Sequence, residues 1–376
     1  MTSPSITDAA LGTGARIGRY FSLVSMLPAL FLTGWTVVLI GSGAWAGTPN
    51  LRRLGTNLSG ISLGGYAWIL LATAISALFL HPLQLGMTRV LEGYWGSSRL
   101  ATILLRLRIT HYRKKKSRLN RRQTQLDLRR QEVLTWVIVD KYLNDLATKP
   151  EKATNPFALN DADFRNAILK LLPSPKAHTA SGFHAALAHV PHQMQRYPTA
   201  RRMMPTRLGN ALRSAEDRIG RQYGLDAIRT APYITLVAPD KHVDHLHDAR
   251  QQMDTSIRLC VVALVATLET VAAMLTDRWW LLTSLVPYGF TWIAYRAAVA
   301  GAGEYMETVR TIVDLNRFRL YEELHVKHPD SSDEERAANV GLMALLGGAK
   351  ISFPYRKPDF GDPDTDGVPP TSPGNP

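Results

Sequence analysis

The chain has 376 residues and a formal net charge of +13, with a mean hydropathy of −0.09. The near-neutral mean hides a segregation, because apolar residues concentrate in separate blocks and the remainder is polar and basic. The positive charge predicts an anionic partner, either a lipid surface or a nucleic acid. The single cysteine, Cys260, lies inside an apolar block, which excludes an internal disulfide and is typical of a small buried hydrophobe.

Two apolar blocks lie in the N-terminal part of the chain, at Tyr20–Trp45 and Ser62–Leu85. A helix of roughly 20 apolar residues crosses about 30 Å of hydrocarbon, so each block predicts a membrane span. A signal peptide is the alternative for the first block, since Ala44-Trp45-Ala46 resembles a cleavage site. The apolar core of a signal peptide is only about 7–15 residues long, which favours a span. His81-Pro82 is expected to end the uninterrupted part of the second block.

A second hairpin is predicted at Ser256–Ala302, where apolar runs of roughly 20 residues flank a polar turn at residues 276–278. Residues 250–256 lead directly into the third span, so we expect one helix to continue from the cytoplasm into the membrane. The two hairpins at residues 20–85 and 256–302 therefore bracket the polar part of the chain.

An acidic side chain, Glu269, lies inside the third apolar run. An ionisable residue in hydrocarbon costs roughly 2.5 kcal/mol or more, and it is a functional candidate by default. Arg296 is excluded as its partner, since a rise of 1.5 Å per residue separates the two by roughly 15 Å in depth. The expected partners are hydroxyls such as Thr270, a residue of the other hairpin, or water, and a place near the outer head groups stays open. Arg296 is expected level with Arg258, where both snorkel to the interface.

A run of Lys and Arg follows the second apolar block. It comprises Arg113, Lys114, Lys115, Lys116, Arg121 and Arg122. Ahead of this run, the apolar residues Leu100, Ile103, Leu104 and Leu107 recur at helical spacing. Lys and Arg near span ends stay on the cytoplasmic side, so the run predicts that residues 86–255 and both termini are cytoplasmic. Arg52 and Arg53 in the expected outer loop argue weakly against this orientation.

Three interpretations of the basic run stay open. It is a solvated helix surface, a site for anionic phospholipid head groups, or a nucleic-acid site. A cluster of this size beside a span gains about 1 kcal/mol per cation near an anionic leaflet. The nucleic-acid interpretation is the least favoured, because the chain has no RNP-type aromatic motif, zinc spacing or helix-turn-helix pattern.

Further along, residues 205–227 form a block with a turn, a charged helix containing Arg207 and Arg213, and a second turn at Tyr223-Gly224. This block and the run Leu91–Gly96 resemble a family of bacterial, largely actinobacterial, multi-span membrane proteins. The chain departs from that family's pattern at residues 218–220, where an aromatic and a proline are expected. The resemblance implies a membrane location and architecture, and it brings no assigned activity. Arg207 and Arg213 are candidates for binding a lipid or a partner.

The best metal candidate is the set His242, His245 and Asp248, whose spacing places them on neighbouring turns of a helix. No second half-site accompanies them, and a solvated polar helix is the favoured interpretation. No catalytic motif and no cofactor site is recognisable.

The sequence therefore predicts an all-α membrane protein with four spans in two hairpins. The segments are a cytoplasmic N-terminus (1–19), hairpin 1 (20–85), a basic helical cytoplasmic domain (86–255), hairpin 2 (256–302), C-terminal helices (303–348) and a disordered tail (349–376). Ser332 followed by Glu335 is expected to cap the last helix. We expect a non-enzymatic membrane-tethered scaffold or sensor that contacts anionic phospholipid or a protein partner. The alternatives are an oligomeric channel or transporter using Glu269 and a membrane-bound metalloenzyme.

Overall fold

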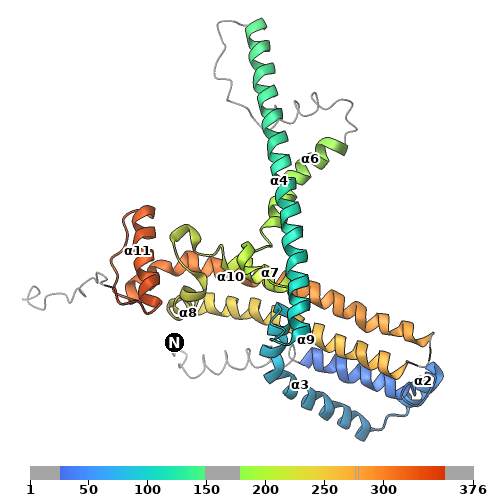
Figure 1. Cartoon of the computed structure of the whole chain (residues 1–376). Coiled ribbons are helices and arrows are strands. Elements are labelled where there is room, and N and C mark those ends of the chain that lie inside the picture. The colour runs from blue at the N-terminus through green and yellow to red at the C-terminus, as the bar shows by residue number, and fades with distance from the viewer. Residues whose placement is uncertain (1–25, 149–177, 276, 278, 352–376) are drawn as a thin grey trace, which may run out of the picture. The chain divides into compact units, whose positions relative to one another are not determined.

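The computed structural model describes residues 26–148, 178–275, 277 and 279–351, and these residues form helices and no sheet (Figure 1). Residues 149–177 of the predicted cytoplasmic domain and the predicted tail from residue 352 lie outside the described residues. Contacts divide the chain into two compact units. Unit 1 comprises residues 1–217 and 247–307, and unit 2 comprises residues 218–246 and 308–376. Each unit is described by itself.

Unit 1 contains the apolar helices. In chain order, they and their connecting elements are the Met26–Gly41 helix, α2 (Leu51–Ser59), α3 (Leu63–Glu92), α9 (Asp240–Ala273), η4 (Trp280–Ser284) and α10 (Leu285–Glu323). Among the described residues, α3 and α9 are long and apolar enough to cross a membrane. The described part of the first block forms a shorter helix than a full span requires. The fourth block does not meet the same criterion, since Pro287, Tyr288 and Arg296 dilute its apolar character.

Local sequence explains where α3 begins and ends. The Ser62 hydroxyl accepts a hydrogen bond from the Gly65 amide at 3.2 Å and caps the first turn. Gly93 ends the helix with φ 111°, a left-handed conformation that favours glycine. Helix α3 continues through Pro82 to Glu92, beyond the point where the uninterrupted apolar run was expected to end. In an apolar helix, side chains, neighbouring helices or small backbone adjustments can satisfy the carbonyl group that a proline leaves without an N–H donor.

A small apolar core joins these helices near the turn between α9 and η4. Leu39, Ala44 and Met274 are buried, and Trp35 and Trp280 pack against them. At the other end, Gly301 of α10 lies so close to α9 that an added Cβ would be 3.2 Å from the Met253 Cα. Helix α10 continues without interruption from the predicted hairpin 2 into the predicted C-terminal helices. Gly301 within it allows the close packing of α10 on α9.

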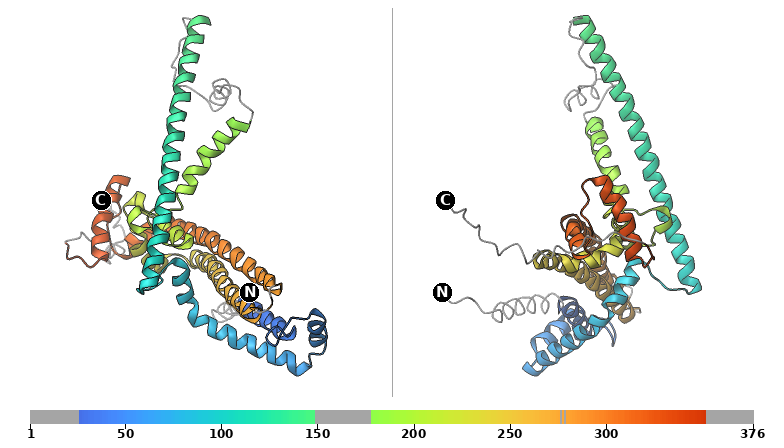
Figure 2. Two further views of the ribbon diagram at one scale, coloured as in Figure 1. Left: turned by 45° about the vertical axis from the view of Figure 1, so that its right-hand side comes forward. Right: turned by 90° about the vertical axis from the view of Figure 1, so that its left-hand side faces the viewer.

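Helix α4 (Arg99–Thr148) is a single helix of 50 residues, which carries the whole basic run. Its direction differs steeply from that of α3, which ends close to where α4 begins (Figures 1 and 2). Helix α6 (His178–Met194) packs against α4. Helix α6 carries His189 and His192, with Pro191 between them.

Unit 2 is built on buried polar side chains. Its elements are the ends of α9 and α10 together with η3 (Arg221–Tyr223), α8 (Ala227–Val237) and α11 (Ser332–Leu346). The Tyr321 hydroxyl donates to Asn339 Oδ1 at 2.6 Å, and Asn339 Nδ2 donates to the Tyr223 carbonyl at 2.8 Å. Arg317 Nε donates to Glu335 Oε1 at 2.9 Å, and its guanidinium lies 4.1 Å from the centre of the Tyr223 ring. These bonds tie α10, α11 and η3 together.

The cap of α11 differs from the expected one by a single residue. Ser331, not Ser332, accepts from the Glu334 amide at 3.2 Å, and Glu334 in turn accepts from the Asp330 amide at 2.9 Å. Glu335 is then free of the cap and lies buried against Arg317. The ion pair between Glu335 and Arg317 therefore favours Ser331 over Ser332 as the residue that caps α11.

Candidate functional site

The two long faces of α4 have different environments. On the covered face, Ala101 and Tyr112 are buried, and the Tyr112 ring lies 6.2 Å from that of Tyr197, just after α6. Lys116 Nζ donates to the Pro198 carbonyl at 2.6 Å, which holds the same segment on α4. Lys116 was one of the predicted binding residues, but its ammonium group already has a hydrogen-bond partner within the protein.

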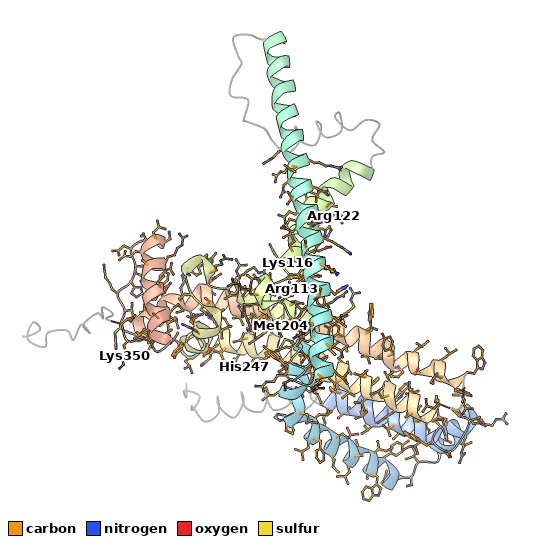
Figure 3. The ribbon with its side chains drawn as sticks, viewed as in Figure 1. Arg113, Lys116, Arg122, Met204, His247 and Lys350 are labelled. Atoms are coloured by element: carbon orange, nitrogen blue, oxygen red, sulfur yellow. The ribbon has the colours of Figure 1, made fainter. Side chains whose placement is uncertain are left out.

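Most of the remaining basic run points away from this covered face. Arg113, Lys114, Arg121 and Arg122 are exposed, whereas Lys115, three residues after Tyr112, borders the covered face and is half-buried. Figure 3 shows Arg113, Lys116 and Arg122 spread along the middle of the helix. The charges therefore form a stripe along a helix rather than a cluster that converges on one pocket. A stripe of separate cations fits a repeating or planar array of anions.

The two sequence stretches that carry the family resemblance meet in unit 1. The Thr206 hydroxyl donates to the Glu92 carbonyl at 2.7 Å, across 114 positions of the sequence. Gly209 of α7 (Arg207–Glu216) lies against the same carbonyl, so that an added Cβ would be 2.0 Å from the Glu92 oxygen. We call this contact between the end of α3 and the start of α7 the α3–α7 joint. Only glycine at 209 allows the two backbones to approach this closely.

Further bonds support the α3–α7 joint. Thr206 caps α7 by accepting from the Gly209 amide at 3.0 Å. Asn210, which is almost completely buried, accepts from the Met204 amide at 2.9 Å and donates to the Met204 carbonyl at 2.8 Å. The amides of Arg207 and Leu208 lie within hydrogen-bond distance of the Tyr295 hydroxyl, at 3.1 and 3.4 Å. The backbone amides of the first turn of α7 thus have hydrogen-bond partners in Thr206 and Tyr295.

The predicted residues Arg207 and Arg213 have different roles in this arrangement. Arg207 is exposed, whereas Arg213 contacts the Tyr94 hydroxyl and donates to Glu216 at 2.9 Å. Burial alone lowers the pKa of Arg213, but the Glu216 carboxylate and Tyr94 more than offset it, and the pKa is raised overall. Arg213 is therefore a positioning residue of the joint.

The sequence interpretation missed Arg202, which completes the network. Its guanidinium donates to Glu216 at 2.7 Å and also contacts Asp217. Asp217 accepts in addition from the Thr199 amide at 3.0 Å. The only available signal was an Arg pair shortly before α7, and nothing in its spacing identified carboxylates that lie 14 and 15 positions away.

Glu269 finds its partner in the first apolar helix. The Thr36 hydroxyl donates to Glu269 Oε2 at 3.0 Å, so the partner is a residue of the first apolar block, one of the alternatives that the sequence left open. The neighbouring Trp35 indole donates to Thr270 at 2.8 Å, and Thr33 and Thr73 share a hydrogen bond of 2.8 Å. These bonds link the Met26–Gly41 helix to α9 and α3. Arg296 is occupied elsewhere, with its guanidinium 4.9 Å from the Trp292 ring centre.

Arg258 does not snorkel as the sequence suggested, because its side chain is buried and its Nε has no hydrogen-bond partner in the described structure. It lies one helical turn from Asp254, which is also buried. Asp254 Oδ2 accepts from Gln84 Nε2 of α3 at 2.5 Å and lies 3.8 Å from Arg250 Nε. Packing of α3 and α10 on α9 covers these groups, so depth along the helix alone did not predict their exposure.

The metal candidate receives no structural support. In the described part of the chain, no three His, Cys, Asp or Glu side chains lie close enough together to hold a metal ion. His242 Nδ1 lies 3.1 Å from Asn316 Nδ2 of α10 within unit 2. The imidazole is therefore part of the polar packing of that unit.

No protein-family model, curated protein or solved structure matches the chain. The resemblance to bacterial multi-span membrane proteins therefore stays a prediction, based on the two stretches that meet at the α3–α7 joint.

Proposed function

We propose that the protein is a membrane-tethered scaffold or sensor whose α4 binds the anionic phospholipid head groups of the membrane that anchors it. The observation that carries this proposal is the succession of α3 and α4. An apolar helix exposed on nearly all sides is separated by residues 93–98 alone from a helix with an exposed basic face. An anchor and an anion-binding surface are thus adjacent.

Burial supports a membrane environment for α3. Only 6% of its most apolar window is buried, compared with 44% for the corresponding window of α9. The core helix of a soluble protein is apolar because it is covered, whereas α3 presents bulky apolar side chains without cover. Leu63, Trp68, Leu78 and Phe79 are each more than half exposed. Such a surface is stable in hydrocarbon and a liability in water.

The proposed topology has four crossings and both termini in the cytoplasm. The first crossing includes the Met26–Gly41 helix, and the fourth includes the first half of α10. The density of Lys and Arg after α3 favours a cytoplasmic α4. In this topology α2, with Arg52 and Arg53, lies on the outer side.

Electrostatics favours lipid as the anionic partner. Each Lys or Arg near an anionic leaflet contributes about 1 kcal/mol, and the attraction decays over a Debye length of about 8 Å at physiological salt. A helix adjoining the span is held within that distance without any further loss of freedom. The exposed stripe on α4 therefore needs no pocket to select anionic lipid.

A lipid-selectivity experiment tests the proposal. The full-length protein is reconstituted into phosphatidylcholine vesicles with traces of spin-labelled phosphatidylserine or phosphatidylcholine. The motionally restricted fraction of each label reports relative affinity. We expect a preference for phosphatidylserine that declines with added salt. The double variant Arg121→Gln/Arg122→Gln should lose up to about 1 kcal/mol of preference per cation.

The matched control is Arg52→Gln/Arg53→Gln, which removes an equally exposed pair of neighbouring cations from α2. In the proposed topology this pair is on the other side of the membrane, and labelled lipid confined to the cytoplasmic leaflet should not respond. Unchanged phosphatidylserine preference after neutralising Arg113, Lys114, Arg121 and Arg122 together would refute lipid binding by α4. Neither transport through Glu269 nor metal catalysis gains a specific observation from the described residues.

A further inference from the structure

The first turns of α4 expose an apolar stripe that the basic run does not explain. Leu100, Ile103, Leu104 and Leu107 are 75%, 55%, 54% and 63% exposed. Their spacing places all four on one side of the helix. The other side of the same turns carries the buried Ala101 and the half-buried Leu105. The exposed stripe is therefore a surface feature, and the core of unit 1 does not use it.

The apolar stripe continues directly into cations. Advancing along α4 by three or four residues from Leu107 leads to His111, Lys114 or Lys115, Arg118, and then Arg121 or Arg122. These steps keep to one helix face. The face is thus apolar for its first two turns and basic for the next three or four. Side chains on its back, such as Tyr112 and Lys116, are engaged with the segment that follows α6.

We propose that Leu100, Ile103, Leu104 and Leu107 insert into the boundary between head groups and acyl chains of the anchoring membrane. The α4 helix then lies along the cytoplasmic surface, with its basic turns over the head groups. This inference rests on the proposed function and specifies how the helix meets the lipid. Amphipathic helices with one apolar and one cationic surface bind membrane interfaces in this way.

Continuity with α3 selects lipid as the occupant of the stripe. Leu85 and Val90, in the last turns of α3, are 67% and 54% exposed, so uncovered apolar surface reaches the end of that helix. The chain then turns at Gly93, and Trp95 Nε1 donates back to the Val90 carbonyl at 2.9 Å. Aromatic residues with a polar end favour the membrane interface. The turn places the start of α4 beside the end of a proposed span.

The arrangement of unit 1 agrees with this position. Helix α4 leaves the end of α3 at a steep angle in the views of Figures 1 and 2 instead of extending its direction. A helix at a steep angle to the end of a span runs along the surface of the bilayer rather than away from it. A soluble extension of the span would need no apolar stripe.

A second copy of the chain is a poorer occupant. Pairing two α4 helices through this face would oppose cations along the basic turns. The apolar stripe also stops after two turns, which is shorter than the three or four heptads that a coiled coil needs. Charge and length both disfavour self-association through this face.

Depth measurements on the reconstituted full chain test the inference. In a Cys260→Ser background, an environment-sensitive fluorophore is attached after Leu104→Cys, Arg118→Cys or Leu70→Cys. Leu70 is an exposed residue in the apolar part of α3 and gives the reference for full immersion. Quenching is measured with phospholipids brominated on their acyl chains and with aqueous iodide. We expect the Leu104 probe to be quenched by brominated lipid and shielded from iodide, and the Arg118 probe to be quenched by iodide.

The outcomes separate this inference from the proposed function. Equal iodide quenching of the Leu104 and Arg118 probes, with phosphatidylserine preference intact, would overturn insertion and leave head-group binding standing. Lipid quenching of the Leu104 probe without any phosphatidylserine preference would support insertion and refute head-group binding. A triple variant, Leu100→Ser/Leu104→Ser/Leu107→Ser, carries a probe at Ile103 as a second measurement. Its probe should move to the aqueous side, whereas an unchanged depth would overturn the role of the stripe.

Discussion

Each unit contains a closely packed contact between separate helices. These are the α3–α7 joint of unit 1 and, in unit 2, the contact of α10 with α11 and η3, which we call the joint of unit 2. The α3–α7 joint brings backbone against backbone, with Gly209 on the Glu92 carbonyl. The joint of unit 2 brings side chain against side chain, through Arg317, Glu335 and Asn339. The first therefore tolerates no added volume. The second tolerates volume but needs every buried polar atom to keep a partner.

The largest expected effect follows from adding one methyl group to the α3–α7 joint. In Gly209→Ala the new Cβ would lie 2.0 Å from the Glu92 oxygen, so the two helices must separate. Overpacking typically costs about 1–3 kcal/mol, and a clash with backbone belongs at the upper end or beyond. We expect a lower thermal midpoint in detergent and faster hydrogen exchange in residues 199–217, measured by mass spectrometry on the full chain.

Gly86→Ala provides the matched control, since nothing lies within 4 Å of a Cβ added to this helical glycine. Replacing an exposed helical glycine by alanine stabilises by about 0.5–1 kcal/mol. The thermal midpoint should therefore stay or rise. If Gly209→Ala behaved like Gly86→Ala, the close approach of α3 and α7 would be wrong.

A smaller effect is expected from removing a charge in unit 2. Glu335→Gln keeps the volume but leaves Arg317 without its carboxylate, which lies 2.9 Å away. Breaking a fully buried pair costs about 3–5 kcal/mol, and the partial exposure of Arg317 together with its place over Tyr223 reduces this to about 2 kcal/mol. Hydrogen exchange should increase in α11 and η3 and stay unchanged in residues 199–217.

Asp333→Asn is the control, because Asp333 pairs with Arg336 at 3.0 Å on the surface of the same helix. An exposed pair contributes about 0–1 kcal/mol. A loss of protection as large as that of Glu335→Gln would show that net charge on α11, not the buried pair, governs this joint.

The sequence predicted helices better than it predicted their contacts. Apolar spacing located α3 and the apolar part of α9, and it identified Cys260 as buried, because these properties depend on neighbours along one helix. The cap of α11 was placed one residue too late. Ser331 and Ser332 are each followed three residues later by Glu, so the local pattern is the same in both registers. Burial of Glu335 against Arg317 decides between them.

The contacts that form the two joints could not be predicted from local sequence patterns. Both stretches that meet at the α3–α7 joint were singled out in the sequence, but nothing in either stretch says that Thr206 bonds to Glu92 across 114 positions. The sequence gives no sign either that Gly301 of α10 approaches Met253 of α9. Partners of buried charges, such as Thr36 for Glu269, depend in the same way on which helices pack together.

The smallest effect concerns Tyr321, whose hydroxyl is buried in the joint of unit 2. Burial, with the nearby Glu335 carboxylate, raises the pKa of Tyr321 from 10.0 to about 12. The folded state thus favours the neutral phenol. In the unfolded chain the phenol ionises from pH 10 upward, so the contribution of Tyr321 to stability is complete below pH 10 and is lost as pH rises towards 12.

Tyr321→Phe should cost about 1 kcal/mol at neutral pH, because Asn339 Oδ1 loses its donor. This deficit should shrink and then reverse as the pH passes from 10 to 12, since Phe has no proton to lose. A phenolate absorbance titration of both proteins gives the direct measurement. The difference between the two curves should titrate near pH 12, and a midpoint near 10 would show that water reaches this hydroxyl. Because the Tyr321 hydroxyl bonds to Asn339 within unit 2, exchange in residues 199–217 should not follow this titration. The two joints are thus distinguished by pH as well as by mutation.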